Sequence, residues 1–356
     1  MKICYIHNLY HPYAVGGAEQ VVAELAAEAR KRGDTPVIIT ATPTGSPTPK
    51  RTVEDGVIIY RFVSPNFFSY RELSQHGFLM KALWHVRDIW NRKSARIVTE
   101  ILEEEKPDLV HTHNLMGIGF TIPQVIAAAE IRHRHTVHDV QLVEPSGVLA
   151  WDHTHDSWLQ TWHSGVMKKV FAGVHEVLFP SIFMQRFYLQ RGFFSHAQVS
   201  TVPPIVEAPV DRPEKTEHTA FLFVGSLVPH KGVATLLQVW EALKTTTDIS
   251  VHIAGDGVLR EYIDAWAQKD ARIHVYGRLD REKVHELYAA SDVLLFPSTC
   301  IENRPHVIVE AASHGLAIIA SDTGGVSELL ENTKNAWLVE PGNVRAWVDA
   351  VNAYLR

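Results

Sequence analysis

The 356-residue sequence has an ordinary globular composition, with 46% hydrophobic and 21% charged residues, and its length predicts two domains. A formal net charge of −6 argues against general nucleic-acid binding. The two cysteines, Cys4 and Cys300, show no disulfide framework and no zinc motif, which favours a reducing compartment. The first residues are typical of a strand rather than a signal peptide, and no apolar run is long enough to span a bilayer. We therefore expect a cytoplasmic protein whose membrane contact, if any, is peripheral.

Short β-branched runs alternate with helical patterns over the first part of the chain. Apolar runs predict strands at residues 3–7, 36–41, 57–62, 109–112, 135–138, 174–179 and 199–202. Apolar residues at helical spacing predict helices at residues 18–31, 78–105 and 118–129, and the Pro/Thr/Ser run 43–49 predicts a loop. Such alternation is typical of parallel strands covered by helices.

A segment rich in prolines and charges, residues 202–217, predicts a linker that divides the chain. We place the domains at residues 1–205 and 206–356. The alternation restarts after the linker, with predicted strands at 220–224, 250–254, 273–276, 293–296 and 317–320. The predicted fold class is α/β, with two doubly wound, parallel-sheet, Rossmann-like domains. Ligands of such sheets bind at the carboxyl ends of the strands, so we expect the site in the cleft between the domains.

Two glycine-containing turns lie between a predicted strand and a predicted helix. The first domain has Gly16-Gly17-Ala18-Glu19, and in the second Gly225 and Ser226 precede His230-Lys231-Gly232. Such a turn lets the backbone approach a ligand, and the N–H groups of a helix start suit a phosphate or a sugar oxygen. A lysine beside a helix start indicates an anionic ligand such as a diphosphate. The alternatives are tight packing for the glycines and a solvated lysine.

Histidines cluster at two neighbouring predicted strand ends. His111 and His113 are two residues apart and so share a strand face, and His138-Asp139 end the next strand. We favour polar contacts to a sugar as their function. Histidines that satisfy neighbouring backbone groups are the next alternative. A metal site built from His111, His113 and His138 is the third, because it needs three or four converging ligands.

The strongest motif runs from Glu302 to Glu310. Pro305 favours the first position of a helix, which places Glu302 in a loop and Glu310 inside the helix. Two glutamates also form the acid/base pair of many glycoside hydrolases. Their different settings argue instead for two hydrogen-bonding anchors on one extended ligand, with the backbone N–H groups of 303–306 facing it. Gly324-Gly325 follow the next predicted strand and open another helix.

Taken in order, five motifs resemble the GT4 family of retaining glycosyltransferases, which have the GT-B fold. They are Gly-Gly-Ala-Glu near the start, Gly-x-Leu-x-x-x-Lys-Gly after the linker, Ala-Gly-Asp-Gly, Glu-x7-Glu and Asp-Thr-Gly-Gly-Val-x-Glu. The resemblance covers nearly the whole chain and is strongest from Phe221 to Pro341. It implies transfer of a sugar from a nucleotide-diphosphate sugar with retention of configuration, in bacterial polysaccharide or glycoconjugate biosynthesis.

The resemblance also implies roles for individual residues. Three are catalytic: Lys231 holds the diphosphate, Glu302 contacts the donor sugar ring, and His113 lies beside the reacting sugar. Glu310 binds the ribose hydroxyls, and Arg278-Leu279 lie where the family cradles the base. The remaining substrate contacts are expected at Gly16, Gly17, Glu19, His138, Asp139, Ser226, Asn303, Arg304, Pro305, His306 and Val307.

Three features depart from the family pattern. Ser226 stands where family members usually carry an arginine that pairs with the diphosphate, so we hypothesise that Arg304 or His230 partly replaces it. The loop after Glu302 reads Asn-Arg-Pro-His instead of the common glycine-rich form, which leaves the identity of the donor open. The family usually continues beyond a helix like the predicted 344–355 into another that returns to the first domain, whereas this sequence ends there.

Two mechanisms are compatible with retention of configuration. A double displacement needs a carboxylate beneath the anomeric carbon, and Asp139 is the candidate. We favour front-face departure, in which the leaving phosphate takes the acceptor proton while Lys231 and helix N-termini stabilise its charge. No metal and no other cofactor is then expected.

The acceptor is expected at the first domain and is a glycan, a lipid-linked molecule or a small molecule. Residues 67–98 are basic and aromatic and include Trp84 and Trp90, and such a segment can lie on the inner face of an anionic membrane. We favour the alternative, a solvated helix face packed on the sheet.

Three other functions are weighed against this one. A GT-B-fold epimerase shares the nucleotide site but needs no acceptor, and an inactive nucleotide-sugar-binding module lacks turnover. A Rossmann dehydrogenase is disfavoured because Gly16-Gly17 is not followed by the rest of a Gly-x-Gly-x-x-Gly turn.

Overall fold

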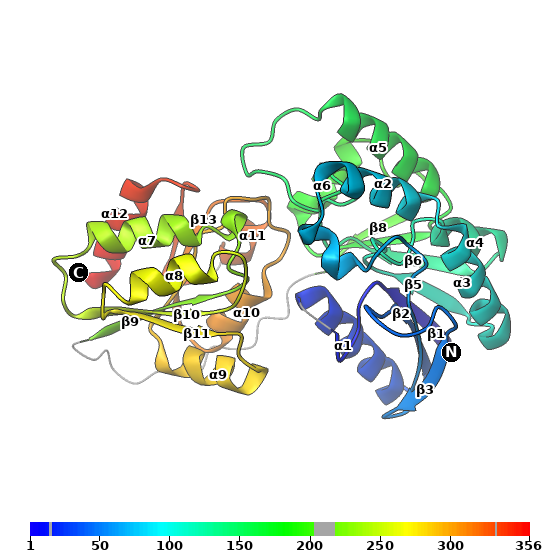
Figure 1. Ribbon diagram of the computed structural model, residues 1–356, viewed down its shortest axis with the longest axis horizontal. Helices are drawn as coiled ribbons and strands as arrows, with labels where there is room; N and C mark the ends of the chain where they lie inside the picture. Colours follow the sequence, from blue (N-terminus) through cyan, green and yellow to red (C-terminus); the bar gives the residue numbers. More distant parts are fainter. Residues whose placement is uncertain (14–15, 203–217, 332) are drawn as a thin grey trace. The chain divides into compact units, whose positions relative to one another are not determined.

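The computed structural model describes residues 1–13, 16–202, 218–331 and 333–356. The chain forms two compact units, the first made of Met1–Val148 with His155–Val202 and the second of Leu149–Thr154 with Pro203–Arg356. Each unit is built on its own largely parallel sheet with helices packed against it (Figure 1), which confirms the predicted α/β fold class. The predicted linker beyond Val202 and the predicted boundary after residue 205 lie outside the described residues.

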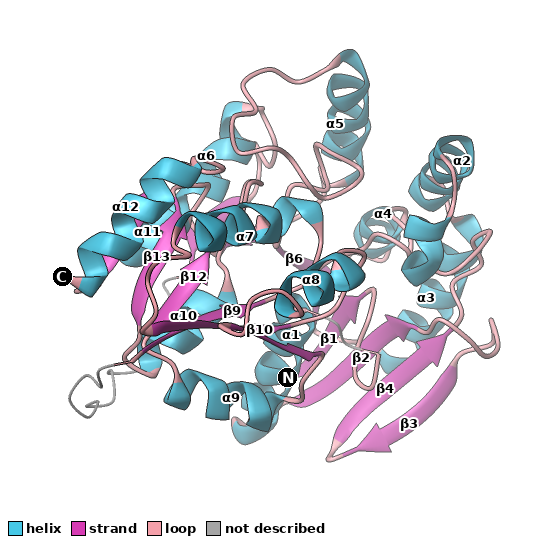
Figure 2. Ribbon diagram, turned by 60° about the vertical axis from the view of Figure 1, so that its left-hand side comes forward, coloured by secondary structure: helices cyan, strands magenta, loops and turns pink. Residues whose placement is uncertain are grey.

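The sheet of the first unit has eight strands in the order β3-β4-β2-β1-β5-β6-β7-β8, the first four of which can be followed in Figure 2. The strands are β1 (Lys2–His7), β2 (Thr35–Ala41), β3 (Lys50–Glu54), β4 (Val57–Phe62), β5 (Leu109–Thr112), β6 (Arg132–Thr136), β7 (Glu176–Phe179) and β8 (Gln198–Thr201). All neighbours pair in parallel except β3 and β4. The helices are α1 (Gly17–Lys31), α2 (Phe78–Ile89), α3 (Arg92–Glu105), α4 (Ile122–Ala128), α5 (Trp158–Val170) and α6 (Ile182–Gln190).

The sheet of the second unit has six strands in the order β11-β10-β9-β12-β13-β14, all parallel. The strands are β9 (Thr219–Val224), β10 (Ile249–Ala254), β11 (Ile273–Gly277), β12 (Val293–Phe296), β13 (Ala317–Ser321) and β14 (Ala336–Val339). The helices are α7 (Val233–Ala242), α8 (Arg260–Ala267), α9 (Arg281–Ala290), α10 (His306–Ser313), α11 (Val326–Leu330) and α12 (Val344–Leu355), with the short 3-10 helix η2 (Pro229–Lys231) before α7.

Alternation along β9 divides the core of the second unit into two layers. Phe221 and Phe223 point into a cluster with Trp240 and Trp347, which come from α7 and α12. Leu222, between them, points into the opposite cluster, which includes residues of α9, α10 and α11. Figure 1 shows α7 and α12 on one side of the sheet and α9 on the other. Both faces are therefore buried, as expected for a parallel sheet, and its carboxyl edge carries the loops that form the site.

Several predicted boundaries are wrong, each for a local reason. The predicted helix 78–105 is broken into α2 and α3, because the Asn91 side chain accepts a hydrogen bond from Ser94 N (3.1 Å) and starts a new helix. The predicted strand 135–138 is β6, Arg132–Thr136, so His138 and Asp139 lie in the loop after it. Strand β3 was not predicted, since its sequence Lys-Arg-Thr-Val-Glu is mostly exposed and carries no apolar signal.

A short segment from the first half of the sequence belongs to the second unit. Leu149 O accepts a hydrogen bond from Ile301 N (2.8 Å), and Trp151 N donates one to Thr299 O (3.1 Å). Between these contacts Ala150 and Cys300 form an isolated antiparallel bridge. The sequence analysis placed these residues in the first domain, because so short a pairing leaves no periodic pattern. The segment braces the loop that carries Glu302.

Asp88 is a carboxyl group buried inside the first unit. It is 0% exposed, and its Oδ2 accepts a hydrogen bond from Gly117 N (2.8 Å). Desolvation raises its pKa from 3.8 to about 7 against the opposing effect of the Gly117 hydrogen bond. The folded state thus holds a proton that the unfolded state releases above pH 4, so this group makes the free energy of unfolding fall as pH rises from about 4 to about 7.

We therefore expect Asp88→Asn to flatten the dependence of stability on pH. The raised pKa of Asp88 corresponds to about 4 kcal/mol. This is an upper bound on how much the group changes the free energy of unfolding between pH 4 and pH 8. Asn keeps an oxygen for Gly117 N, so the variant should gain stability over the parent at pH 8 and lose that advantage at pH 4 to 5. Urea unfolding at both pH values measures this, and parallel profiles for parent and variant would contradict it.

Candidate functional site

The sequence-predicted histidines of the first unit converge where β1 and β5 end. His7 ends β1, and His113 follows β5, whose pairing places Thr112 beside Ile6. The rings of His7 and His113 are stacked with centroids 6.0 Å apart. His138 reaches the same place from the loop after β6, with its Nε2 2.9 Å from His113 Nδ1. His7 was missed by the sequence analysis, although its position at the end of the first strand was the available signal.

The imidazoles of His7, His111 and His113 are neutral at pH 7. Desolvation lowers the pKa of His7 to about 4 and the pKa values of His111 and His113 well below the usual value. A neutral imidazole both donates and accepts hydrogen bonds, as a sugar hydroxyl requires. Throughout the described ranges no group of three or more His, Cys, Asp or Glu residues could hold a metal ion, which argues against the metal alternative for His111, His113 and His138.

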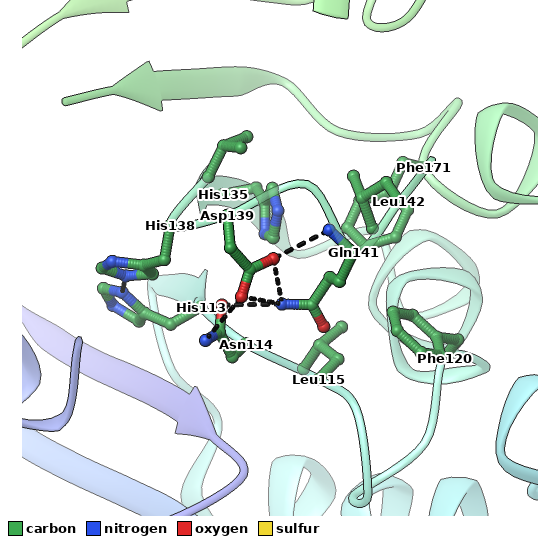
Figure 3. Close-up of a pocket in the computed structure, with 11 residues that line it drawn as sticks. His113, Asn114, Leu115, Phe120, His135, His138, Asp139, Gln141, Leu142 and Phe171 are labelled. Carbon is green, nitrogen blue, oxygen red and sulfur yellow. Dashed lines mark hydrogen bonds between the residues drawn. The ribbon is translucent and has the colours of Figure 1, made fainter. Parts of the chain in front are cut away.

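A small pocket lies beside this cluster in the first unit (Figure 3). Asp139 is its one acidic group, and both carboxylate oxygens are engaged: Oδ1 accepts from Gln141 N (2.8 Å), and Oδ2 accepts from Asn114 Nδ2 (3.3 Å). Gln141 Nε2 also donates to Oδ1 (2.9 Å) and to Asn114 Oδ1 (2.8 Å). Desolvation raises the pKa of Asp139 to about 6 despite these donors. Asn114 and Gln141 were not predicted, since single amides carry no recognisable pattern.

The predicted glycine turn lies at the start of α1. Gly17 is the first residue of the helix, and Gly16 is its N-cap with extended backbone. Glu19 is 9% exposed, and its Oε2 accepts a hydrogen bond from Gly16 N (3.0 Å). This carboxylate therefore stabilises the helix start. A contact of Glu19 with substrate stays a prediction.

In the second unit, Lys231 and Glu302 meet across 71 positions of sequence. Lys231 Nζ lies 2.7 Å from Glu302 Oε1, and Ser298 Oγ donates to the same oxygen (2.7 Å). Burial opposes the charge of Lys231, but the Glu302 carboxylate outweighs it and raises the pKa of the lysine. Burial and Glu302 also raise the pKa of Cys300 to about 11, so this thiol stays neutral. Ser298 was missed, because a serine in a loop after a strand has no distinctive signature.

Two glycines bring the backbones around this pair into direct contact. Gly232 has φ +74°, and a Cβ on it would lie 1.7 Å from Pro297 O. Gly324 has φ +59°, and a Cβ on it would lie 2.0 Å from Glu302 O. Gly325 N donates to Glu302 O (2.8 Å). Gly324 is thus required by packing against Glu302, and any ligand role is additional.

The other predicted contacts lie on loops at the same edge of the second sheet. Ser226 is exposed after β9, and Arg278-Leu279 follow β11. Asn303 is buried and Arg304 half-buried in the loop after β12, and His306 and Val307 begin α10. Pro305 is the N-cap of this helix with extended backbone, not its first helical residue as predicted, because its ψ is 116°.

Glu310 is anchored from behind by Tyr288 of α9. Tyr288 is fully buried, and its hydroxyl donates to Glu310 Oε2 (3.0 Å). Burial and the Glu310 charge raise the pKa of Tyr288, so its hydroxyl stays protonated. The sequence analysis did not find Tyr288, which reads as one more core aromatic of a helix. It fixes one oxygen of the Glu310 carboxylate.

We expect Tyr288→Phe to weaken nucleotide binding about tenfold through the loss of a hydrogen bond to a charged group, with kcat nearly unchanged. Calorimetric titration of a nucleoside diphosphate and of its 2′,3′-dideoxy form measures the effect. If Glu310 binds the ribose hydroxyls, as the resemblance implies, the dideoxy ligand should bind parent and variant alike. Tyr262→Phe, on an exposed side chain of α8, is the matched control. An equal loss for both ligands would mean that Tyr288 acts on the fold alone.

His230 and Arg304 are the two candidates for the cation that Ser226 does not supply. Burial, followed by the charge of Lys231, lowers the pKa of His230, so it is neutral at pH 7. We therefore expect Arg304→Ala to lower kcat about 10- to 100-fold and His230→Ala to have a smaller effect. Steady-state kinetics at pH 7 test this, and full turnover in both variants would end the hypothesis.

Two family models match the chain. The model described as Glycosyltransferase Family 4 matches residues 15–208, and the model described as Glycosyl transferases group 1 matches residues 207–356. Together they cover nearly the whole sequence.

The chain is also similar in sequence to curated proteins. An uncharacterized 42.6 kDa protein in the cps region of Klebsiella pneumoniae is 26% identical over 346 residues, 96% of this chain and 90% of that protein. A lipopolysaccharide 1,2-N-acetylglucosaminetransferase of Salmonella typhimurium is 28% identical over 203 residues, 51% of this chain and 53% of that protein.

Solved structures share the fold. Sucrose-phosphate synthase from Thermosynechococcus elongatus superposes with a TM-score of 0.75 at 19% identity, covering 99% of this chain and 89% of the other. HepE from Anabaena, in complex with UDP-glucose, superposes with a TM-score of 0.68 at 16% identity, covering 100% and 90%.

Proposed function

The chain belongs to glycosyltransferase family 4, and from that premise we propose that it is a retaining, metal-independent enzyme of bacterial polysaccharide or glycoconjugate biosynthesis. Its donor is a nucleotide-diphosphate sugar, and its acceptor is a hydroxyl of a glycan, a lipid-linked molecule or a small molecule. The observation that carries the proposal is the pair Lys231–Glu302, with Nζ and Oε1 2.7 Å apart at the edge of the second sheet. A half-buried cation next to one carboxylate suits a ligand that brings both anionic and hydroxyl oxygens.

The second unit is assigned the donor. Glu310 accepts hydrogen bonds from the ribose hydroxyls, Lys231 donates to the diphosphate, and Glu302 accepts from hydroxyls of the sugar. The base is assigned to Arg278-Leu279. The complex of HepE with UDP-glucose supports a donor of this chemical class for this chain as well.

The first unit is assigned hydrogen bonds to sugar hydroxyls. His113 is buried, neutral and held by His138, so it can donate or accept without adding charge near the anomeric carbon. Gly16, Gly17 and Glu19 are assigned to the same ligand, as the resemblance of their motif suggests.

Front-face departure is the proposed route to retention. The bond from the anomeric carbon to the leaving phosphate breaks, the acceptor oxygen bonds to the same face, and the acceptor proton passes to the leaving phosphate. Asp139 is a poor nucleophile in comparison, since both its oxygens accept hydrogen bonds and its pKa is raised to about 6. Lys231 stabilises the charge that develops on the diphosphate, which is the role a metal ion plays in other transferases.

The setting proposed is the cytoplasmic side of a bacterial envelope. Cys4 and Cys300 are free and buried, in keeping with a reducing compartment. The relative from Salmonella, named for lipopolysaccharide synthesis, supports a role in polysaccharide assembly. Among the described residues no helix is long and apolar enough to cross a membrane.

A thermal-shift screen with UDP-, GDP-, ADP- and dTDP-linked sugars tests the proposal, because a bound donor stabilises the folded protein by mass action. The stabilising donor is then incubated with acceptors in EDTA, and the anomeric configuration of the product is read by NMR. We expect transfer with retention in the presence of the chelator. Conversion of the donor alone to an epimer would favour the epimerase, stabilisation without turnover the inactive module, and restoration of activity only by a divalent ion would contradict metal independence.

A further inference from the structure

Helix α2 exposes its apolar side and buries a carboxyl group. Leu79, Leu83, Val86 and Trp90 follow one another at helical spacing and are 76%, 54%, 46% and 49% exposed. Away from this stripe the helix buries Trp84, Asp88 and Ile89. A surface helix normally carries polar residues on its exposed side, whereas α2 carries large apolar ones there. Large apolar side chains that are exposed and gathered in one place are typical of a binding surface.

The N-terminal half of α5 extends the stripe. Trp158 is 81% exposed, and Leu159 and Trp162 are each 44% exposed. The rings of Trp90 and Trp162 have centroids 6.4 Å apart, so the two helices form one surface, on the side of the first unit where Figure 1 labels α2 and α5. We call it the α2–α5 face and define it by Phe78, Leu79, Leu83, Val86, Trp90, Trp158, Leu159 and Trp162.

Trp84 does not take part in this face. It is fully buried, and its Nε1 donates to Phe68 O (2.9 Å). The sequence analysis counted it among the membrane-facing aromatics of residues 67–98, and it left out α5 altogether. In the structure Trp84 is therefore not exposed, whereas Trp158 and Trp162 of α5 are.

The exposed charged residues next to Trp90 in the sequence are cationic. Asp88 is the one acidic residue from position 73 to position 99, and it is buried. Arg92, Lys93 and Arg96 follow Trp90, are exposed and make no salt bridge with the described parts of the chain. Exposed tryptophans beside unpaired cations match the boundary of an anionic bilayer, where rings lie at the headgroup level and cations meet lipid phosphates.

We propose that the α2–α5 face docks the enzyme on an anionic lipid bilayer, with the apolar side chains in the headgroup boundary and Arg92, Lys93 and Arg96 on the lipid phosphates. The 12-residue α2 lies in the plane of the interface and does not span it. This deepens the proposed function and rests on it in one respect: among the proposed acceptors it selects the lipid-linked one, which is held at the same surface.

Co-sedimentation of the full chain with vesicles tests the proposal. We expect binding to mixed phosphatidylcholine and phosphatidylglycerol vesicles, weak binding to phosphatidylcholine alone, and release at high salt. Leu79→Ser with Trp158→Ser should lower the partition coefficient at least about tenfold. Arg92→Gln, Lys93→Gln and Arg96→Gln should each lower it about fivefold, and on anionic vesicles alone. Val258→Ser with Tyr262→Ser, exposed apolar residues of the second unit, is the matched control and should bind as the parent does.

Three outcomes would overturn the proposal. The first is a parent protein that stays in the supernatant, and the second is a Leu79/Trp158 variant that binds vesicles as the parent does. The third is a dimer in analytical ultracentrifugation that the same variant converts to a monomer, which would assign the face to a second copy of the chain. Donor-induced thermal stabilisation is measured on every variant. This stabilisation should stay at the parental level in every variant. Loss of vesicle binding with unchanged stabilisation then concerns the membrane face alone, whereas absence of stabilisation in the parent would contradict the nucleotide-sugar site.

Discussion

Replacing Lys231 by Met is expected to lower kcat about 10²- to 10³-fold, the usual effect of removing one charge-stabilising donor from a site where negative charge develops. We propose Lys231 as the cation that stabilises the departing diphosphate, because Ser226 stands where the resemblance implies an arginine. Its ammonium group is held in place before any ligand binds, with Nζ 2.7 Å from Glu302 Oε1. A preorganised charge needs no rearrangement as the bond breaks.

The measurement separates binding from chemistry. Steady-state kinetics give kcat, and calorimetry with a nucleoside diphosphate gives its dissociation constant, which should also rise because the free diphosphate is already anionic. Lys231→Arg should recover part of the rate. Lys244→Met is the matched control, because Lys244 is 69% exposed and pairs with Glu241 on the surface of the same unit. A Met variant with parental kcat would remove Lys231 from the mechanism.

The alternation of strands and helices could be predicted because strands buried on both faces are short, continuous apolar runs, whereas helices repeat apolar residues with a period of 3.6. The fold class and the helix 344–355 follow from that pattern, and the structure has α12 at Val344–Leu355. Strand β3 and the segment 149–154 could not be predicted, since exposed edge pairing and isolated bridges leave no apolar period.

For the candidate site too, some features could be predicted from the sequence and others could not. Motif spacing predicted Lys231, Glu302 and Glu310 as site residues, because each follows a predicted strand and ligands of such sheets bind at the carboxyl ends of the strands. Spacing could not show that Lys231 and Glu302 touch, or that Tyr288 supports Glu310 from 22 positions away. Such contacts depend on which loops the sheet order brings together, and β9 and β12 are neighbours only in the folded sheet.

Glu302→Gln should differ from Lys231→Met in its effect on nucleoside diphosphate binding. The amide keeps an oxygen that can accept from Ser298, whose Oγ is 2.7 Å from Oε1, but it removes the charge that raises the pKa of Lys231. The half-buried cation then lacks its partner and is free for an incoming diphosphate. We expect nucleoside diphosphate to bind as tightly as in the parent, or more tightly. We expect kcat to fall about 10²- to 10³-fold, because the sugar loses its charged acceptor.

A double-mutant cycle decides what Glu302 does. If Glu302 acts only by holding Lys231, then Glu302→Gln should have no further effect on kcat in the Lys231→Met background. If it contacts the donor sugar itself, as we propose, a large part of its effect should remain in that background. Glu282→Gln, on an exposed position of α9, is the control for loss of one negative charge in the second unit. Because the two residues share one hydrogen bond, neither single variant separates these roles, whereas the cycle does.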